Sequence, residues 1–446
     1  MKPQELAVLI DGRTIGHVRQ NLGRLRFRYE DDWRSDRQSF ALSLSMPLTA
    51  AEHPHKFIDA FLWGLLPDNA DVLDRWAKQF HVSARNPFAL IAHVGEECAG
   101  AVQFATAHRA VELSVSRALE VDWLDTQQIA QRLRALRDDH AAWRSPADIG
   151  QFSLAGAQPK TAFFRDAKGR WGVPAGRTPT THILKPATGR LEGQVENEHM
   201  CLTLAHALGL PTATSTVMRF DTEIAIVIER YDRITEQAAP PKPANRGGSR
   251  RSKVATTPRV LRVHQEDMCQ ALGVGPTLKY QNEGGPSPED IVSLLQTHSS
   301  RPDEDIRTFI DALALNWLIG GTDAHAKNYS LLHGARGALR LAPLYDVASI
   351  LPYTDVDPKR VKLAMKIGGE YRMHAIGARQ WRKLSVALRL DPNETLGRIT
   401  ALAARVAVEV VDVRRQLRRD GLRHAILDKL ATVLVTRAHA CAAELK

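Results

Sequence analysis

An aspartate and an asparagine five residues apart, Asp323 and Asn328, lie in the segment GGTDAHAKNYSLL, directly after the apolar stretch ALALNWLIG. A carboxylate at the first position can accept the proton of an attacking hydroxyl, and a carboxamide oxygen at the second can hold magnesium against phosphate groups. The spacing D-x-x-x-x-N is that of the catalytic loop of protein kinases. It does not suffice alone, because Asp and Asn also cap and turn ordinary loops.

Two further side chains favour the chemical interpretation. Asp346, in LAPLYDVAS, follows a predicted short strand, where a kinase places its second magnesium carboxylate. Lys185, in THILKP, stands late in a predicted strand, ahead of a helix that carries Glu196 and Glu198. Its ammonium could reach the α- and β-phosphates of a nucleotide. We therefore expect ATP and Mg²⁺ as cofactors, because Asn328 and Asp346 would supply the hard oxygen ligands that magnesium prefers.

A loop of small residues precedes this strand. In FSLAGAQPKTAFF, Ala155, Gly156 and Ala157 would let the backbone approach a phosphate closely, and their N–H groups could cradle it. The chain has neither GxxxxGK[ST] nor the GxGxxG of ordinary kinases at this place. Further on, VIERYDR ends a predicted strand between the two halves of the chain, so backbone groups at Glu229 and Tyr231 could pair with adenine.

The hydrophobic patterns show which elements must hold these residues. Short strand patterns recur between residues 151 and 232 with one helix among them, and the chain becomes mostly helical after residue 260. Residues 1–106 run from strands to helices, and 107–149 look polar and helical. We predict an α+β fold with three parts: an N-terminal subdomain (1–106), a connecting helical segment (107–149), and a bilobal protein-kinase-like domain (150–446) with a β-rich N-lobe (about 150–232) and a helical C-lobe (about 260–446).

Charge and composition set looser limits. The net charge of +10 over 446 residues favours an anionic partner, but it does not separate nucleic acid from phosphate ligands or acidic proteins, and basic residues spread over a solvated surface would give the same number. Residues 237–259 hold six basic residues and no acidic ones among many Pro, Gly and Ser, which predicts a mobile basic loop. Its composition fits a solvated insertion better than a nucleic-acid contact.

The cysteines and the apolar runs indicate the compartment. The four cysteines include no CxxC pair, which argues against a zinc site and against a disulfide framework and fits a reducing cytoplasm. No apolar run approaches the roughly 18–20 residues of a membrane helix. The first residues read as a strand and turn rather than as a signal peptide. We expect a cytoplasmic protein without a membrane partner.

With these pieces in place, the sequence resembles the HipA family, the serine/threonine-kinase toxins of type II toxin–antitoxin systems. Nine phrases occur in the family's order: SLAGAQPKTA, TPTTHILKP, ENEHMCLTLAHALGL, ERYDR, QEDMCQALG, KYQNEGGP, NWLIGGTDAHAKNYSLL, APLYDVAS and KLAMKIGG. The leading FLWGLLPDN and NPFALIAHVGEECAGAVQF resemble the family's amino-terminal subdomain. Together these phrases cover nearly the whole chain, so the resemblance implies a HipA-like fold.

The resemblance implies a role for each candidate residue. It implies Asp323 as catalytic base, Asn328 and Asp346 as magnesium ligands, a phosphate loop of Ala155, Gly156, Ala157, Gln158, Pro159 and Lys160, a phosphate contact at Lys185, an adenine site at Glu229, Arg230 and Tyr231, and a nucleotide-site lining of His325, Ala326, Lys327, Asn328 and Tyr345. Ser153 falls where the family autophosphorylates a serine. Phosphate there would place negative charge beside the ATP loop and expel the nucleotide.

Two features depart from the family, and both bear on regulation or partners. Pro159 stands where the family commonly has Glu, which could alter the flexibility of the phosphate loop, and the basic segment 237–259 is longer than expected.

The family's biology gives the expected function. Similar proteins phosphorylate an aminoacyl-tRNA synthetase, typically glutamate–tRNA ligase, which arrests translation and promotes dormancy or persistence. A small helix-turn-helix antitoxin, HipB, neutralises them, and the complex represses its own operon, so operator DNA is an expected partner through the antitoxin. Arg379, in ARQWRK, is a candidate DNA-facing residue. Two alternatives remain: a small-molecule kinase of similar bilobal fold, and a catalytically silent co-repressor.

Overall fold

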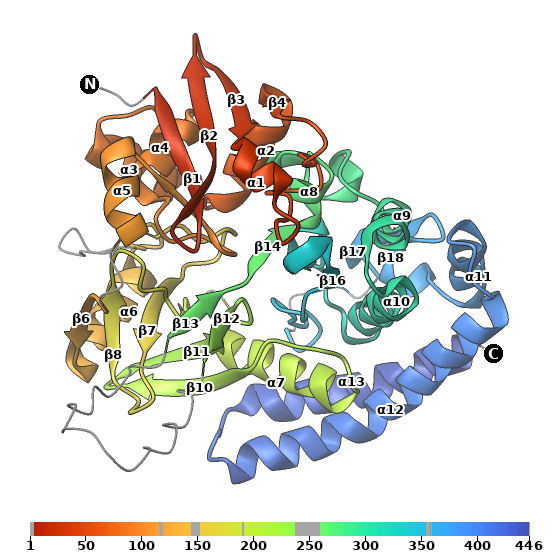
Figure 1. Ribbon diagram of the computed structural model, residues 1–446. Helices are drawn as coiled ribbons and strands as arrows, with labels where there is room; N and C mark the ends of the chain where they lie inside the picture. The colour runs from red at the N-terminus through yellow and green to blue at the C-terminus, as the bar shows by residue number, and fades with distance from the viewer. Residues whose placement is uncertain are drawn as a thin grey trace, which may run out of the picture.

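The computed structural model describes residues 4–115, 119–143, 152–189, 191–236, 259–353, 357 and 359–445. The predicted basic loop lies outside these residues except for Arg259. Figure 1 shows three parts, which we name by their residues: the N-terminal domain (4–115) at the top, the N-lobe (119–232) at the lower left, and the C-lobe (233–445) on the right.

The N-terminal domain is an antiparallel sheet covered by helices. The sheet order is β4-β3-β2-β1-β5, with strands β1 (Glu5–Ile10), β2 (Arg13–Asn21), β3 (Arg24–Tyr29), β4 (Glu52–Pro54) and β5 (Val102–Ala105). Its helices are α1 (Asp31–Ser35), α2 (His55–Leu65), α3 (Ala70–Phe80), α4 (Pro87–Val94) and α5 (Ala107–Val115). In β3 the apolar Leu25, Phe27 and Tyr29 alternate with exposed arginines, so one face of the sheet is buried against the domain core.

The N-lobe is built on a second, six-stranded sheet with the helices α6 (Thr126–Asp138) and α7 (Gln194–Ala207), and α7 carries part of the site. The order is β10-β11-β9-β7-β8-β6, with strands β6 (Val121–Leu124), β7 (Thr161–Arg165), β8 (Trp171–Pro174), β9 (His182–Pro186), β10 (Ser215–Phe220) and β11 (Glu223–Glu229). Helix α6 buries Ile129 and Leu133 against this sheet, and α7 packs against the C-lobe as well.

The prediction of a purely helical connection over residues 107–149 is wrong in one respect. Val121–Leu124 form β6, which pairs with β8. A strand of four residues is too short to show an alternating pattern in the sequence. Residues 107–143 therefore pack on two sheets: α5 contacts the sheet of the N-terminal domain, whereas β6 and α6 belong to the N-lobe.

The C-lobe is mainly helical, as predicted. Its helices are α8 (Met268–Ala271), α9 (Pro288–His298), α10 (Pro302–Ile319), α11 (Ala378–Ala387), α12 (Pro392–Arg419) and α13 (Ala425–Glu444). Small strand pairs and triplets lie among them: β12 (Arg233–Thr235), β13 (Val260–Arg262), β14 (His264–Asp267), β15 (Ser330–His333), β16 (Leu339–Leu341), β17 (Lys362–Ile367) and β18 (Glu370–Arg372).

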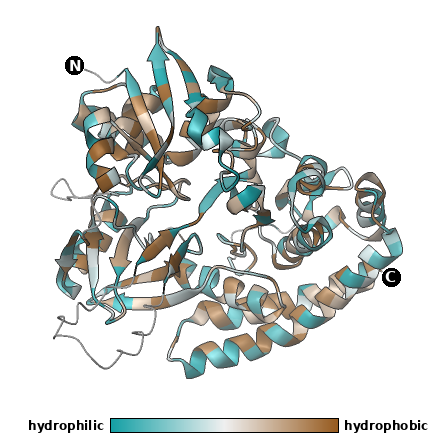
Figure 2. Ribbon diagram, in the orientation of Figure 1, coloured by the Kyte–Doolittle hydropathy of each residue, from teal (hydrophilic) through white to brown (hydrophobic). Residues whose placement is uncertain are grey.

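Helices α12 and α13 run beside each other along the lower edge of the molecule, and hydrophilic and hydrophobic residues alternate along both, as expected for helices with one buried face (Figures 1 and 2). Within the described residues, none of the helices combines the length and the apolar character that crossing a bilayer would require.

The N-terminal domain also docks onto the C-lobe. A segment after α1 contributes the Leu42 carbonyl, which lies 2.8 Å from His264 Nε2, and the Leu44 N–H, which donates to Glu266 at 2.9 Å. The Ser45 hydroxyl donates to the Gln270 carbonyl at 2.9 Å. These polar contacts join the N-terminal domain to β14 and α8 of the C-lobe.

Candidate active site

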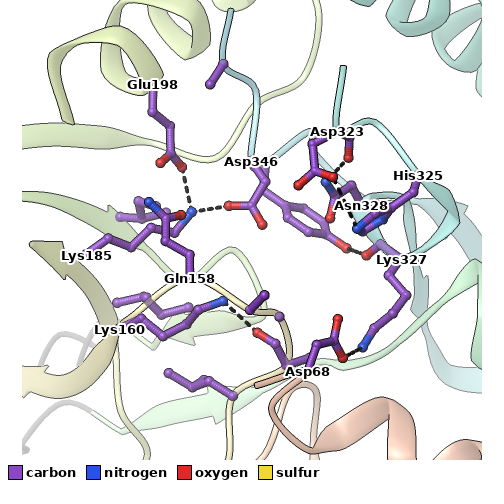
Figure 3. A pocket seen from close by; sticks show the side chains of 18 of the residues that line it. Asp68, Gln158, Lys160, Lys185, Glu198, Asp323, His325, Lys327, Asn328 and Asp346 are labelled. Carbon is purple, nitrogen blue, oxygen red and sulfur yellow. Dashed lines mark hydrogen bonds and ion pairs between the residues drawn. The ribbon is translucent and has the colours of Figure 1, made fainter. Parts of the chain in front are cut away.

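A cavity of about 680 Å³ lies where the three parts meet. Its lining includes most of the predicted site residues: Ala155, Gly156, Ala157, Gln158, Pro159, Lys160, Lys185, Glu229, Arg230, Tyr231, Asp323, His325, Lys327, Asn328, Tyr345 and Asp346. Figure 3 shows the charged members pointing toward one another from the phosphate loop, β9, α7 and the loop after α10. Residues far apart in the sequence therefore share one chamber.

The loop that carries Asp323 and Asn328 begins where α10 stops. Gly320 ends the helix with φ of 69°, a left-handed conformation that glycine adopts without a side-chain clash. The chain then turns so that the Asn328 side-chain N–H donates to the Asp323 carbonyl at 2.7 Å. Because that bond uses the amide nitrogen, the carboxamide oxygen of Asn328 is left for a cation. The Asp323 side chain remains 70% exposed and is open to an incoming acceptor.

Lys185 lies at the centre of a buried ion cluster. Its strand, β9, runs between β7 and β11, and its side chain is 4% exposed. The ammonium donates to Glu198 of α7 at 2.7 Å and also to Asp346. Burial alone would lower the pKa of Lys185, but the two carboxylates outweigh burial and raise it above the usual value. The lysine is therefore a fixed positive charge beside the cavity.

Asp346 has an unusual backbone. Its φ of 53° lies in the left-handed region, which non-glycine residues rarely occupy. Although burial favours its neutral form, the ammonium groups of Lys185 and Lys160 hold the pKa of Asp346 well below the ordinary range, so it is ionised. Burial and the nearby Asp346 charge raise the pKa of Glu198. A strained backbone such as that of Asp346 is often found where a side chain must be oriented for function.

The oxygen atoms of Asp346 and Asn328 fit a magnesium nucleotide. A carboxylate and a carboxamide oxygen face the same chamber (Figure 3). Mg²⁺ commonly takes only one or two protein oxygens and fills its octahedron with water and substrate phosphates. In the part of the chain that the structure describes, no group of three or more His, Cys, Asp or Glu side chains could hold a metal by itself. The donor set therefore suits a metal that arrives with phosphates.

A hydrogen bond from Lys160 joins the two ends of the phosphate loop (155–160). Gly156 has φ of 100°, a backbone conformation that favours glycine. The Lys160 ammonium donates to the Ala155 carbonyl at 2.6 Å. Burial lowers the pKa of Lys160 to about 8, despite the opposing effect of Asp346. The loop therefore carries a positive charge that can be removed at mildly alkaline pH.

The end of β11 offers two backbone groups to a ligand. The N–H groups of Glu229 and Arg230 already donate to the carbonyls of Thr214 and Thr181, each at 2.9 Å. The carbonyl of Glu229 and the N–H of Tyr231 are the next groups along this edge of the cavity. A planar base with adjacent donor and acceptor atoms could pair with them.

The side chain of Arg230 is not available to a bound base. Its guanidinium is buried and donates to Asp232 at 2.7 Å and to Glu97 at 3.0 Å. Arg233 and Arg262 bind the same Glu97 carboxylate. The Arg230 N–H donates to the Thr181 carbonyl and the Arg230 carbonyl accepts from the Arg233 N–H at 3.1 Å, so neither the side chain nor the backbone donor of Arg230 is left for the predicted ligand contact.

The rings of Tyr280 and His325 lie beside the proposed base, Asp323. The Tyr280 hydroxyl donates to Asp323 Oδ1 at 2.5 Å, and its ring meets the His325 ring edge-on with centroids 4.9 Å apart. Burial lowers the pKa of His325 to about 4, so this imidazole is neutral at pH 7. His325 Nε2 lies 3.9 Å from Asp323.

Three predicted residues lie outside the cavity lining. Ala326 is buried in the C-lobe core, because in the short 3-10 turn of Ala326–Asn328 its side chain faces inward. Ser153 is fully buried, and its hydroxyl donates to the Leu65 carbonyl at 2.7 Å. Arg379 is an exposed residue of α11. Its contact with DNA stays a prediction.

The cavity lining also includes charged residues that the sequence analysis did not assign to the site, among them Asp68, Glu198 and Lys279, and Tyr280 follows Lys279 in the same loop. Glu198 had a sequence signal, since it lies on the helix that follows Lys185. Asp68 in LLPDN and Tyr280 in KYQNEGGP lie in phrases that carried the resemblance, but no spacing rule connects them to the site.

Comparisons with known proteins agree with this geometry. Residues 6–105 match the model of the HipA N-terminal domain, and residues 152–411 match that of the HipA-like C-terminal domain. A protein of Sinorhizobium fredii named as a candidate kinase, Y4mE, is 33% identical over 419 residues, which cover 93% of this chain and 92% of the relative. The serine/threonine-protein kinase toxin HipA of Shewanella oneidensis is 29% identical over 400 residues, covering 86% and 83%.

A solved structure extends the likeness to the fold. The Shewanella oneidensis HipA chain, solved with HipB and its operator DNA, superposes with a TM-score of 0.80 at 25% sequence identity. The match covers 99% of this chain and 98% of that one. The predicted α+β, kinase-like bilobal fold with an additional N-terminal domain is therefore confirmed.

Proposed function

Because this chain belongs to the HipA family of kinases, we propose that it is an ATP- and Mg²⁺-dependent serine/threonine protein kinase that acts as the toxin of a HipBA-type toxin–antitoxin system. The observation that carries the proposal is the convergence of Asp323, Asn328, Asp346 and Lys185 on one cavity. Each side chain is of the type that phosphoryl transfer needs at its place.

The proposed mechanism assigns one step to each group. Asp323 accepts the proton of the acceptor hydroxyl as the hydroxyl oxygen attacks the γ-phosphorus; the bond from that phosphorus to the β,γ-bridging oxygen breaks, and ADP leaves. Lys185, held by Glu198, pairs with the α- and β-phosphates, and the loop Ala155–Lys160 covers them. Asn328 and Asp346 would hold the magnesium, which would neutralise phosphate charge. The backbone of Glu229 and Tyr231 receives the adenine edge.

The proposed partners follow from the relatives. The Shewanella oneidensis structure contains HipA, HipB and operator DNA, which supports a HipB-like helix-turn-helix antitoxin as a partner of this chain and contact with operator DNA through that complex, with Arg379 as a candidate DNA-facing residue. We propose a cytoplasmic protein substrate, an aminoacyl-tRNA synthetase such as glutamate–tRNA ligase, whose phosphorylation would arrest translation and promote persistence.

We propose that autophosphorylation of Ser153 turns the kinase off. Ser153 lies two residues before the phosphate loop, and its N–H donates to the Glu97 carbonyl at 2.8 Å. A buried serine can be phosphorylated only after its segment leaves this position. The added charge of about −2 cannot return to the same apolar site, so the phosphate loop would stay displaced.

Phosphorylation with labelled ATP and Mg²⁺ tests the proposal. Wild-type protein should label Ser153 and a synthetase acceptor, and Asp323→Ala should label neither while still binding nucleotide. Asp303→Ala, which removes an exposed aspartate of α10, is the matched control and should behave as wild type. Absence of label in all three proteins would favour a silent co-repressor, and labelling of a small acceptor alone would favour a small-molecule kinase.

A further inference from the structure

A carboxylate of the N-terminal domain lies between two ammonium groups of the C-lobe. Asp68 Oδ1 accepts a hydrogen bond from Lys327 Nζ at 2.5 Å, and Oδ2 accepts one from Lys279 Nζ at 2.9 Å. Figure 3 shows the Asp68 carboxylate and the Lys327 ammonium pointing toward each other. The Lys327 side chain is only 3% exposed, so water screens this pair little.

The backbone of the same residue holds the phosphate loop. The Asp68 N–H donates to the Gly156 carbonyl at 3.0 Å, and Pro67 forms a parallel bridge with Gly156. The turn that carries Asp68 joins α2 to α3, and Asn69 caps α3 by accepting from the Asp71 N–H. Asp68 therefore stands on a well-anchored turn and contacts both the phosphate loop and the catalytic loop.

Lys327 lies in the loop that carries the proposed base and the proposed metal ligand, so its position affects both. It precedes the proposed metal ligand Asn328 and follows the proposed base Asp323 by four residues. Its carbonyl accepts from the Tyr345 hydroxyl at 2.7 Å, so backbone and side chain are both fixed. One carboxylate between two ammonium groups leaves a net positive charge at the cavity wall, which suits a triphosphate.

We infer that Asp68 is a positioning residue of the active site: by holding the Lys327 ammonium while its own backbone binds the phosphate loop, it aligns the catalytic loop with the nucleotide loop. The N-terminal domain is then a working part of the catalytic centre and not only a neighbour of it. This inference depends on the proposed kinase function.

Kinetics of full-length variants test it. Asp68→Asn keeps the size of the side chain and removes its charge. We expect kcat to fall about 100-fold, as a misplacement of about 1 Å can do, while KM for ATP changes less than threefold, because Lys185 and the adenine edge are untouched. Asp74→Asn removes an exposed aspartate of α3 in the same domain and is the matched control, with wild-type kcat.

A second variant, Asp68→Glu, tests the inference even if Asp68→Asn does not fold. Asp68→Glu keeps both ion pairs but lengthens the side chain by one methylene, so it should fold, with a kcat between those of the wild type and Asp68→Asn. Folded variants that turn over at the wild-type rate, even with a lower melting temperature, would overturn the assignment, since a purely structural contact affects stability only. An inactive wild-type protein would instead overturn the proposed function, and the assignment with it.

Discussion

The hydroxyl of Tyr280 donates a hydrogen bond of 2.5 Å to Asp323 Oδ1, the atom that would receive the proton of an acceptor. The phenol therefore competes with a substrate hydroxyl for one of the two carboxylate oxygens of the base, although the Asp323 side chain as a whole stays 70% exposed. Tyr280 lies in the segment between two short 3-10 turns, Pro276–Leu278 and Gln281–Glu283, so it can leave without disturbing a long element.

Tyr280→Phe should make the base more available. A hydrogen bond to a charged group contributes about 1.5–3 kcal/mol, and an acceptor must replace it, so we expect kcat/KM for the protein acceptor to rise by about tenfold. Initial rates at varied acceptor concentration measure this. A variant slower than the wild type would show that Tyr280 orients Asp323 instead of blocking it.

Asp346→Ala should weaken nucleotide binding only when magnesium is present. The substitution removes a proposed metal ligand and leaves Lys185 paired with Glu198. We expect the Kd of ATP with Mg²⁺ to rise at least tenfold, or about 1.4 kcal/mol, and the Kd in EDTA to change little. Titration calorimetry under both conditions measures the difference, and equal effects in both would remove Asp346 from the metal site.

Ser153→Ala should prolong activity. The variant cannot acquire the phosphate that we propose displaces the loop, so its progress curve should stay linear where that of the wild type declines. It also loses the hydrogen bond to the Leu65 carbonyl, at a cost of about 1 kcal/mol in the free energy of unfolding. Ser153→Asp is the companion variant and should bind ATP poorly. A Ser153→Ala curve that declines like the wild type would argue against this switch.

Nucleotide affinity should fall as the pH rises through about 8. The folded protein loses the Lys160 proton near that pH, because burial lowers its pKa, and the neutral amine attracts phosphates less. Stability should change in the opposite sense: between about pH 8 and the ordinary lysine value of 10.5 the unfolded chain binds more protons, so the contribution of Lys160 to the free energy of unfolding rises. Lys160→Gln should flatten both profiles, and a steep affinity profile in that variant would assign the proton elsewhere.

Glu97→Gln should destabilise the junction between the N-terminal domain and the segment 230–233 that follows β11. Although burial opposes ionisation, Arg262, Arg233 and Arg230 lower the pKa of Glu97 to about 2. Leaving these buried guanidinium groups undercompensated should cost about 3–5 kcal/mol in the free energy of unfolding. Chemical denaturation measures this, with Glu112→Gln, an exposed ion-pair residue, as the control, which should change the free energy of unfolding far less.

Because of the Glu97 carboxylate, we expect the folded protein to lose stability in acid. Because the folded pKa of Glu97 lies below its ordinary value of 4.5, its contribution to stability is present above that value and is lost as the pH falls toward 2. Glu97→Gln should therefore show a shallower loss of stability in this range than the wild type. Parallel acid profiles for the two proteins would contradict the pairing of Glu97 with the arginines.

The sequence by itself determined the family, the division into a strand-rich and a helical half, and the residues whose chemistry suits phosphoryl transfer. These depend on local signals: the alternation of apolar residues, glycine at a left-handed turn, and an aspartate and an asparagine at a fixed spacing in one loop. Asp323 and Asn328 could be paired from the sequence because five residues of one turn hold them together.

Only the tertiary structure decided which distant charges neutralise one another. Asp68 meets Lys327 across 259 residues, and Lys185 meets Asp346 across 161. No periodicity encodes such pairs, since they arise when separate sheets and helices pack around a shared cavity. The same packing buried Ala326 and Ser153 and turned the Arg230 guanidinium toward Glu97, because each side chain follows the local backbone and the space that its neighbours leave.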